Sequence, residues 1–315
     1  MVAELKSLIS ALDLVEGDVR LASLTFSITL FTDRVLSDIP EATLRCQEMF
    51  LKRCPQDALR FYATENMRRH RPVNKKTLTM LPVRLATPSA KPEYIVLELK
   101  DGQRAEDAPK YFFKVVGSEK GSIGHKEHLA NAVCLAFPPD AALEDTDGML
   151  QIVVDLCEEF PFQSGTAGFA LHCSRYETQP SQSHAVSTSM RYPEIDIVRL
   201  PEDIHAVEQN AVKTIGWITL VGEGFIDKLG GIDRVQRKLG GKTSCTRMKS
   251  GYLLRIGDKP TLSDRNRNER CPDYTALYGA LKPLIDVAAD QSQWFDLGGS
   301  NEDEQTRAWY RRFEE

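Results

Sequence analysis

Two apolar runs separated by a turn do most to limit the fold of this chain. Tyr94–Lys100 has the composition of a strand, and Asp101-Gly102 follows it as a turn. Tyr111–Val116 is a second strand-like run, and Ala132–Phe137 is a third. Neighbouring strands that are joined by turns, without a helix between them, usually pair antiparallel. The sequence therefore predicts an antiparallel sheet in this region.

Other segments add helices to the predicted sheet. Leu24–Phe31 alternates apolar and hydroxyl residues, which predicts a strand with one buried and one exposed face. Met149–Phe160 has apolar residues at helical spacing, and Pro161 ends that pattern. The fold class that follows is α+β, with a mostly antiparallel sheet flanked by helices.

One polar segment suggests how the chain is divided. Residues 176–186 are rich in Ser, Gln and Pro, which is typical of a long loop. We expect an N-terminal α+β lobe over 1–175, a loop or seam over 176–200, and a C-terminal α+β lobe over 201–315. A chain of 315 residues suits one large domain or two lobes in close contact, which here would form one unit.

Composition excludes several classes of protein. The net charge of −5 disfavours a general nucleic-acid binder, so no direct nucleic-acid partner is expected. Seven cysteines without a CxxC pair disfavour a disulfide framework or a zinc knuckle. The N-terminus lacks the basic and apolar regions of a signal peptide, and no apolar run approaches about 18 residues. We expect a cytoplasmic protein that contacts no membrane.

Three features could carry chemistry, and each has a plainer interpretation. Glu98-Leu99-Lys100 resembles half of a metal-nuclease signature, but no Asp precedes it closely enough to supply a second carboxylate. His125 and His128 have helical spacing for zinc, but no third ligand lies at a recognised spacing. The basic stretch 60–76 could follow a phosphate backbone or form a solvated surface. We therefore expect no catalytic residue, no cofactor and no metal.

Residues 251–284 combine a strand, a turn, a charged loop and a helix. Tyr252–Ile256 predicts a strand, and Gly257–Pro260 a turn. Pro272 opens a helix with one apolar face. Between them lies the loop Asp264–Arg270, which is rich in arginine. Such a loop is either a solvated connection, with arginines paired to local carboxylates, or a recognition surface.

Four segments, taken in order, resemble a known family. They are GTAGFALHC at 165–173, WITLVGEGFIDKLGG at 217–231, GYLLRIGDKPTLSDRNR at 251–267 and TRAWYRRF at 306–313. Together they resemble the bacterial type VI immunity family, whose members neutralise toxins delivered by the type VI secretion machine. The resemblance covers most of the chain and brings no catalytic residues with it.

The resemblance implies a non-enzymatic partner for a cognate type VI effector toxin. Some relatives of the family lie beside toxins resembling restriction endonucleases, which favours a nuclease as the effector. Charge density between packed elements suggests the contact residues, which are Asp264, Arg265, Arg267, Arg270, Glu302, Asp303 and Glu304. The alternatives are a metal-dependent nuclease or hydrolase with an unrecognised site, and a structural adaptor of the secretion apparatus.

Overall fold

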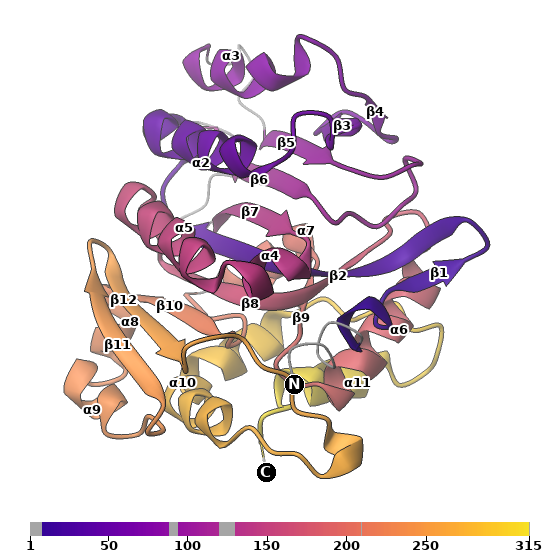
Figure 1. The fold of residues 1–315 in the computed structure, drawn as a ribbon. Helices are drawn as coiled ribbons and strands as arrows, with labels where there is room; N and C mark the ends of the chain where they lie inside the picture. Colours follow the sequence, from indigo (N-terminus) through magenta and orange to yellow (C-terminus); the bar gives the residue numbers. More distant parts are fainter. Residues whose placement is uncertain (1–7, 88–93, 120–129, 209, 315) are drawn as a thin grey trace.

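The computed structural model describes residues 8–87, 94–119, 130–208 and 210–314. Within these residues one mixed sheet of twelve strands runs through the molecule, with its helices in layers beside it (Figure 1). The strands are β1 (Leu14–Glu16), β2 (Val19–Thr32), β3 (Phe61–Thr64), β4 (Arg71–Pro72), β5 (Tyr94–Lys100), β6 (Phe112–Ser118), β7 (Asn131–Phe137), β8 (Ser164–Cys173), β9 (Asp196–Val198), β10 (Ile218–Gly222), β11 (Thr243–Met248) and β12 (Gly251–Ile256).

The helices are distributed along the whole chain. They are α2 (Pro40–Arg53), α3 (Met80–Ala86), α4 (Pro139–Glu144), α5 (Thr146–Glu159), α6 (Thr178–Arg191), α7 (Leu200–Val207), α8 (Glu223–Lys228), α9 (Ile232–Gln236), α10 (Pro272–Gln291) and α11 (Glu302–Tyr310). Short 3-10 helices are η1 (Leu36–Asp38), η2 (Thr77–Thr79) and η3 (Arg265–Arg267).

The sheet confirms the predicted α+β class. Its strand order is β11-β12-β10-β8-β2-β7-β6-β5-β3-β4, with β1 paired to β2 and β9 to β8. The pairing of β8 with β9 is parallel, and the other pairings in the described sheet are antiparallel. The three strands predicted within 94–137 are β5, β6 and β7, and they are neighbours in the sheet.

Strand β2 lies at the centre of the sheet, and the prediction that it has one exposed face is wrong. Its residues are buried continuously from Leu21 to Thr32. On one face Phe26, Ile28 and Leu30 join the core beneath α2 and α5. On the other face hydroxyl groups find partners instead of water: the Thr25 hydroxyl donates to the Ala170 carbonyl at 3.1 Å. Paired hydroxyls make this polar face compatible with burial.

Residues 176–186 also differ from the sequence prediction, because most of this segment belongs to helix α6. Its serines hydrogen-bond within the helix: the Ser181 hydroxyl donates to the Glu177 carbonyl at 2.6 Å, and Ser189 to Val186 at 3.1 Å. Ala185 and Val186 then reach the core. The composition of a loop therefore belongs here to a packed helix whose hydroxyls bond to the backbone.

The sheet continues across the predicted seam. Strand β8, which precedes residues 176–200, pairs with β10, which follows them. Around this junction, one large core cluster gathers α6, α10 and α11, and Trp217 of the neighbouring cluster is fully buried. A division of the molecule into two lobes stays a prediction.

Candidate functional site

The charged loop between β12 and α10 is anchored by Asp264, of which only 5% is exposed. Its carboxylate accepts hydrogen bonds from Arg191 Nε at 2.9 Å and Nη2 at 2.6 Å. The Tyr192 hydroxyl donates to the same carboxylate at 3.2 Å. These bonds, the Arg191 pair foremost, lower the pKa of Asp264 to about 2. Asp264 thus fixes the loop to the end of α6.

Arg265 also points its guanidinium at the protein. It donates to the Met190 carbonyl at 3.3 Å and to the Arg312 carbonyl. The Arg312 side chain is itself buried and donates to the carbonyls of Pro193 and Trp309, at 2.9 and 3.0 Å. Arg265 therefore joins the charged loop to the end of the C-terminal helix α11.

Arg267 and Arg270 are the outward members of this loop. The Arg267 side chain is 77% exposed and lies 3.7 Å from Asp264. Arg270 is exposed and lines two hollows of about 460 and 590 Å³. Of the four predicted loop residues, these two keep their charge accessible to a partner.

The acidic segment Glu302–Glu304 forms the first turn of α11. Glu302 accepts backbone hydrogen bonds from Leu297 and Gly298, both at 3.0 Å, and so closes the preceding turn. Asp303 lies 3.7 Å from Arg307, and Glu304 is exposed. Helix α11 has nine residues and is therefore about 13 Å long, and the contact between Arg265 and Arg312 lies just beyond its C-terminal end. The structure therefore places the two predicted groups at opposite ends of one helix.

A second polar site lies on the sheet face formed by β5 and β6. Glu98 is buried there and accepts from His70 Nε2 at 2.5 Å and from Lys114 Nζ at 2.9 Å. The other ring nitrogen of His70 lies 2.9 Å from the Tyr176 hydroxyl. Burial opposes ionisation of Glu98, but Lys114 and His70 outweigh it and lower the pKa of this carboxyl. Lys114, Glu98, His70 and Tyr176 thus form one linear chain of polar contacts, which we call the Glu98 chain, and in it the negative charge of Glu98 is compensated.

This arrangement argues against the metal-nuclease interpretation of Glu98-Leu99-Lys100. The Glu98 carboxylate is already occupied by two side chains, so it is not free for a divalent ion. Among the residues that the structure describes, no group of three His, Cys, Asp or Glu could hold a metal. His125 and His128 lie outside the described residues. Alternation along β5 places Glu98 on the face opposite Ile95, Leu97 and Leu99. Antiparallel pairing with β6 then sets Lys114 across from Glu98, but the contact with His70 arises only in the fold.

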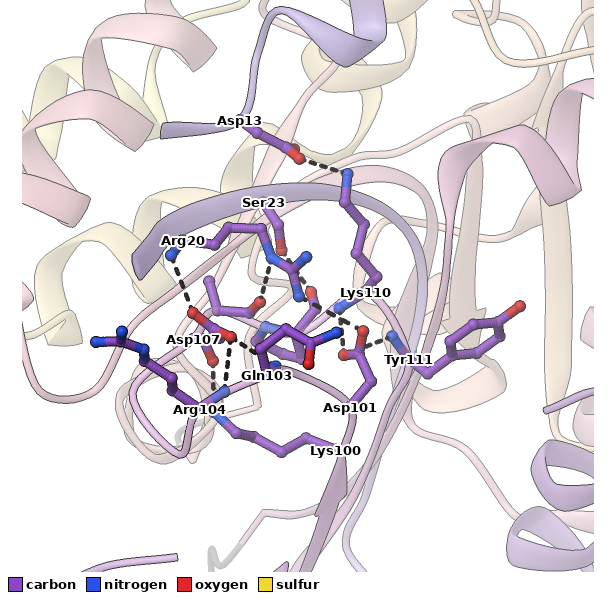
Figure 2. A network of polar contacts seen from close by, with 12 residues as sticks. Asp13, Arg20, Ser23, Lys100, Asp101, Gln103, Arg104, Asp107, Lys110 and Tyr111 are labelled. Carbon is purple, nitrogen blue, oxygen red and sulfur yellow. Dashed lines mark hydrogen bonds and ion pairs between the residues drawn. The ribbon is translucent and has the colours of Figure 1, made fainter. Parts of the chain in front are cut away.

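The Lys100 half of the tripeptide has a structural role in the connection between β5 and β6 (Figure 2). Its Nζ donates to the Ala105 carbonyl at 2.8 Å and to the Asp107 carbonyl. Asp107 in turn accepts from the backbone of Arg20 at 3.0 Å, which ties this connection to the start of β2. Burial lowers the pKa of Lys100 to about 8. Lys100 therefore closes the loop between β5 and β6.

A cavity of about 430 Å³ opens above the Glu98 chain. Its walls come from the turn after β3, the loop from β8 to α6, and the start of α7. Arg175 and Arg199 lie on two of these walls. No sequence motif indicated this cavity, because its lining residues are spread from Ala63 to Glu202.

The comparison with protein families decides which family the chain belongs to. The model of the TsiV family, described as type VI immunity for VRR-NUC, matches residues 42–313. The chain belongs to the TsiV family. This confirms the family that the four sequence segments suggested.

A solved structure has a similar fold. It is the Pseudomonas aeruginosa T6SS protein PA0821, with a TM-score of 0.81 and 17% sequence identity. The likeness covers 99% of this chain and 91% of that chain. No curated protein matches the sequence. Among the helices that the structure describes, none has the length and apolarity to cross a membrane.

The motifs that suggested the TsiV family meet in space. GTAGFALHC is β8, WITLVGEGF begins with β10, and GYLLRI is β12. Strands β8, β10 and β12 are successive neighbours in the sheet. TRAWYRRF ends α11 and contacts the charged loop through Arg265. The motifs therefore form three adjacent strands and the end of a helix, and the charged loop Asp264–Arg270 contacts that helix end.

Proposed function

We propose that this protein neutralises a VRR-NUC nuclease effector of a type VI secretion system by binding it stoichiometrically. The match of the TsiV family model to residues 42–313 carries the proposal. In this mechanism the protein makes and breaks no covalent bonds. It covers the active surface of the effector, or the surface through which the effector assembles, in the cytoplasm where DNA is the target.

The stiffness of the fold supports such a role. Buried charges such as Glu98 and Asp264 are held by several partners each, so the surface is largely formed before binding. A stable complex of this kind buries about 1,600 Å² in total. The net charge of −5 would also speed association with a basic nuclease.

The contact residues that we propose are the outward members of the two predicted groups. Arg267, Arg270 and Glu304 are exposed, and Asp303 is half-buried beside them in sequence. Asp264, Arg265 and Glu302 hold the backbone of these segments in place. Their contribution to binding is to position the neighbouring residues.

Co-expression with the effector tests the proposal. An immunity protein restores growth of cells that make the toxin, co-purifies with it, and saturates at a fixed stoichiometry in calorimetry. Purified protein should leave plasmid DNA intact in the presence of magnesium. Cleavage of the DNA would indicate a hydrolase instead, and binding to secretion components without rescue would indicate an adaptor.

A further inference from the structure

The cavity above Glu98 has an unneutralised positive rim. We use the name basic rim for Arg68, Arg69, Arg175 and Arg199. Arg175 and Arg199 line the cavity directly, and the exposed pair Arg68 and Arg69 lies in the chain between the lining residues Met67 and His70. Within the described part of the chain, none of the four forms an ion pair with a carboxylate.

The two arginines that line the cavity have different surroundings. The Arg199 guanidinium stacks on the Phe295 ring at 3.9 Å and donates to the carbonyls of Trp294 and Gln293, at 3.1 and 2.8 Å. Arg175 is exposed and lies 5.9 Å from the Tyr176 ring. Arg199 is therefore held by the protein, whereas the exposed Arg175 is the lining arginine whose planar fork suits a carboxylate from a partner.

The acidic groups of the cavity offset the charge of the rim only in part. Glu98 is compensated by Lys114 and His70. His172 is buried against Ser27, and burial lowers its pKa to about 3, so this ring is neutral. The remaining carboxylates of the lining are Glu65, which lies 3.9 Å from Arg84, and Glu202 at the start of α7.

We propose that the cavity and its basic rim dock an acidic segment of the effector, with Asp or Glu side chains between Arg175 and the pair Arg68–Arg69. This proposal rests on the proposed function, because it names a second surface of the protein that the effector contacts, in addition to the charged loop and the start of α11. Trp294 is 59% exposed, and its carbonyl accepts a hydrogen bond from the lining residue Arg199, so its ring offers an aromatic anchor near that wall.

Charge distribution favours a short acidic protein segment over duplex DNA. Residues 60–76 contain six Lys or Arg residues and one Glu, although the whole chain carries a net charge of −5. The remainder of the chain is therefore strongly acidic and would repel a long polyanion. A short segment meets only the local charge, because salt screens interactions beyond about 8 Å. A concave cavity also suits side chains better than a duplex backbone.

The test compares two variants with the same change in charge. R68E/R175E reverses two charges of the rim, whereas R237E/K238E reverses two exposed charges after α9. Figure 1 shows α9 beside β11, at the end of the sheet opposite β3 and β4. We expect R68E/R175E to weaken effector binding at least about tenfold in calorimetry, since facing like charges cost affinity. The control should bind like the wild type, and both should keep the wild-type Tm.

Each other result has a defined meaning. Wild-type affinity for R68E/R175E overturns the docking proposal and leaves the immunity function standing. Failure of the wild-type protein to bind the effector overturns both. Binding of a short labelled DNA duplex that R68E/R175E abolishes would make the rim a nucleic-acid site and overturn the proposal. Should R68E/R175E lower the Tm, R68Q/R175Q replaces it, and an unchanged affinity of that pair is equally decisive.

Discussion

The Arg191 guanidinium donates two hydrogen bonds to the Asp264 carboxylate, from Nε at 2.9 Å and from Nη2 at 2.6 Å. This pair joins the end of α6 to a loop that is 73 residues further along the chain. The loop therefore contains an inward anchor, Asp264, and two outward arginines, Arg267 and Arg270. A single charge-reversal experiment on the whole loop would confuse these two roles, so they need separate tests.

The anchor predicts a stability that depends on pH. The pKa of Asp264 is about 2 in the fold, against about 3.9 for an ordinary Asp. Its stabilising effect is therefore complete above about pH 4 and is lost as pH falls toward about 2. Asp264→Asn should lower the Tm at pH 7, and its difference from the wild type should shrink between about pH 4 and pH 2. Thermal scans of both proteins across this pH range measure the difference in Tm.

The matched control for this titration is Asp303→Asn, which changes a more exposed carboxylate with one ion pair at 3.7 Å. Its Tm should follow the wild type throughout. A difference between Asp264→Asn and the wild type that stays constant from pH 7 to pH 2 would contradict the assignment, because a lost contact without linked protonation has no such pH dependence.

The outward arginines predict an effect on binding alone. R267E/R270E should weaken effector affinity about tenfold or more, because reversed charges at an interface repel the partner. Arg267 and Arg270 are exposed, so the Tm should change little. Calorimetry and a thermal scan of the same preparation measure both quantities. Unchanged affinity would remove this loop from the interface, and R237E/K238E again serves as the control.

Much of the sheet was predictable because its strands carry local signals. The runs that became β5, β6 and β7 are apolar and lie next to a turn, and Gly102 there takes a φ of +129°. A residue with that φ is usually glycine. Local pattern therefore predicted both the elements and their antiparallel pairing.

The wrong predictions from the sequence share one cause. Whether a polar side chain is buried depends on partners that the local sequence does not show. The hydroxyls of β2 indicated an exposed face, but Ser27 lies 2.8 Å from His172 Nε2, which is 145 residues away. The serines of α6 indicated a loop, but Ser181 bonds within its own helix. The cavity was missed for the same reason, because Glu98 and Tyr176 meet at His70 only in the fold.

The Glu98 chain predicts a large cost for one truncation. Glu98→Ala would leave the buried His70 and the partly buried Lys114 without their shared carboxylate. Removal of one partner from a buried ion pair typically costs about 3–5 kcal/mol of unfolding free energy. Urea unfolding should show a loss of this size. The exposed Glu158 on α5 is the control, and Glu158→Ala should change stability by about 0.5 kcal/mol or less. A similarly small effect of Glu98→Ala would mean that water readily replaces the carboxylate.

The last prediction concerns Gly251, which faces Gly222 where β12 pairs with β10. A Cβ at Gly251 would lie 2.3 Å from the Val221 carbonyl oxygen and 2.6 Å from Gly222 Cα. Both are backbone atoms at the end of the β10–β12 pairing, where Gly222 is the last residue of β10 and Gly251 the first of β12, so room for a Cβ requires the paired strands to shift. Gly251→Ala should therefore cost about 1–3 kcal/mol, as overpacking usually does.

Gly224 provides the comparison for this substitution, because a Cβ there meets no atom within 4 Å and the residue lies in α8. Gly224→Ala should leave stability unchanged or raise it by up to about 1 kcal/mol, since alanine favours helix. Urea unfolding of both variants measures the difference. Equal stabilities would show that β10 and β12 can separate freely, and the glycines of these two motifs would then need an explanation other than the close approach of the strands.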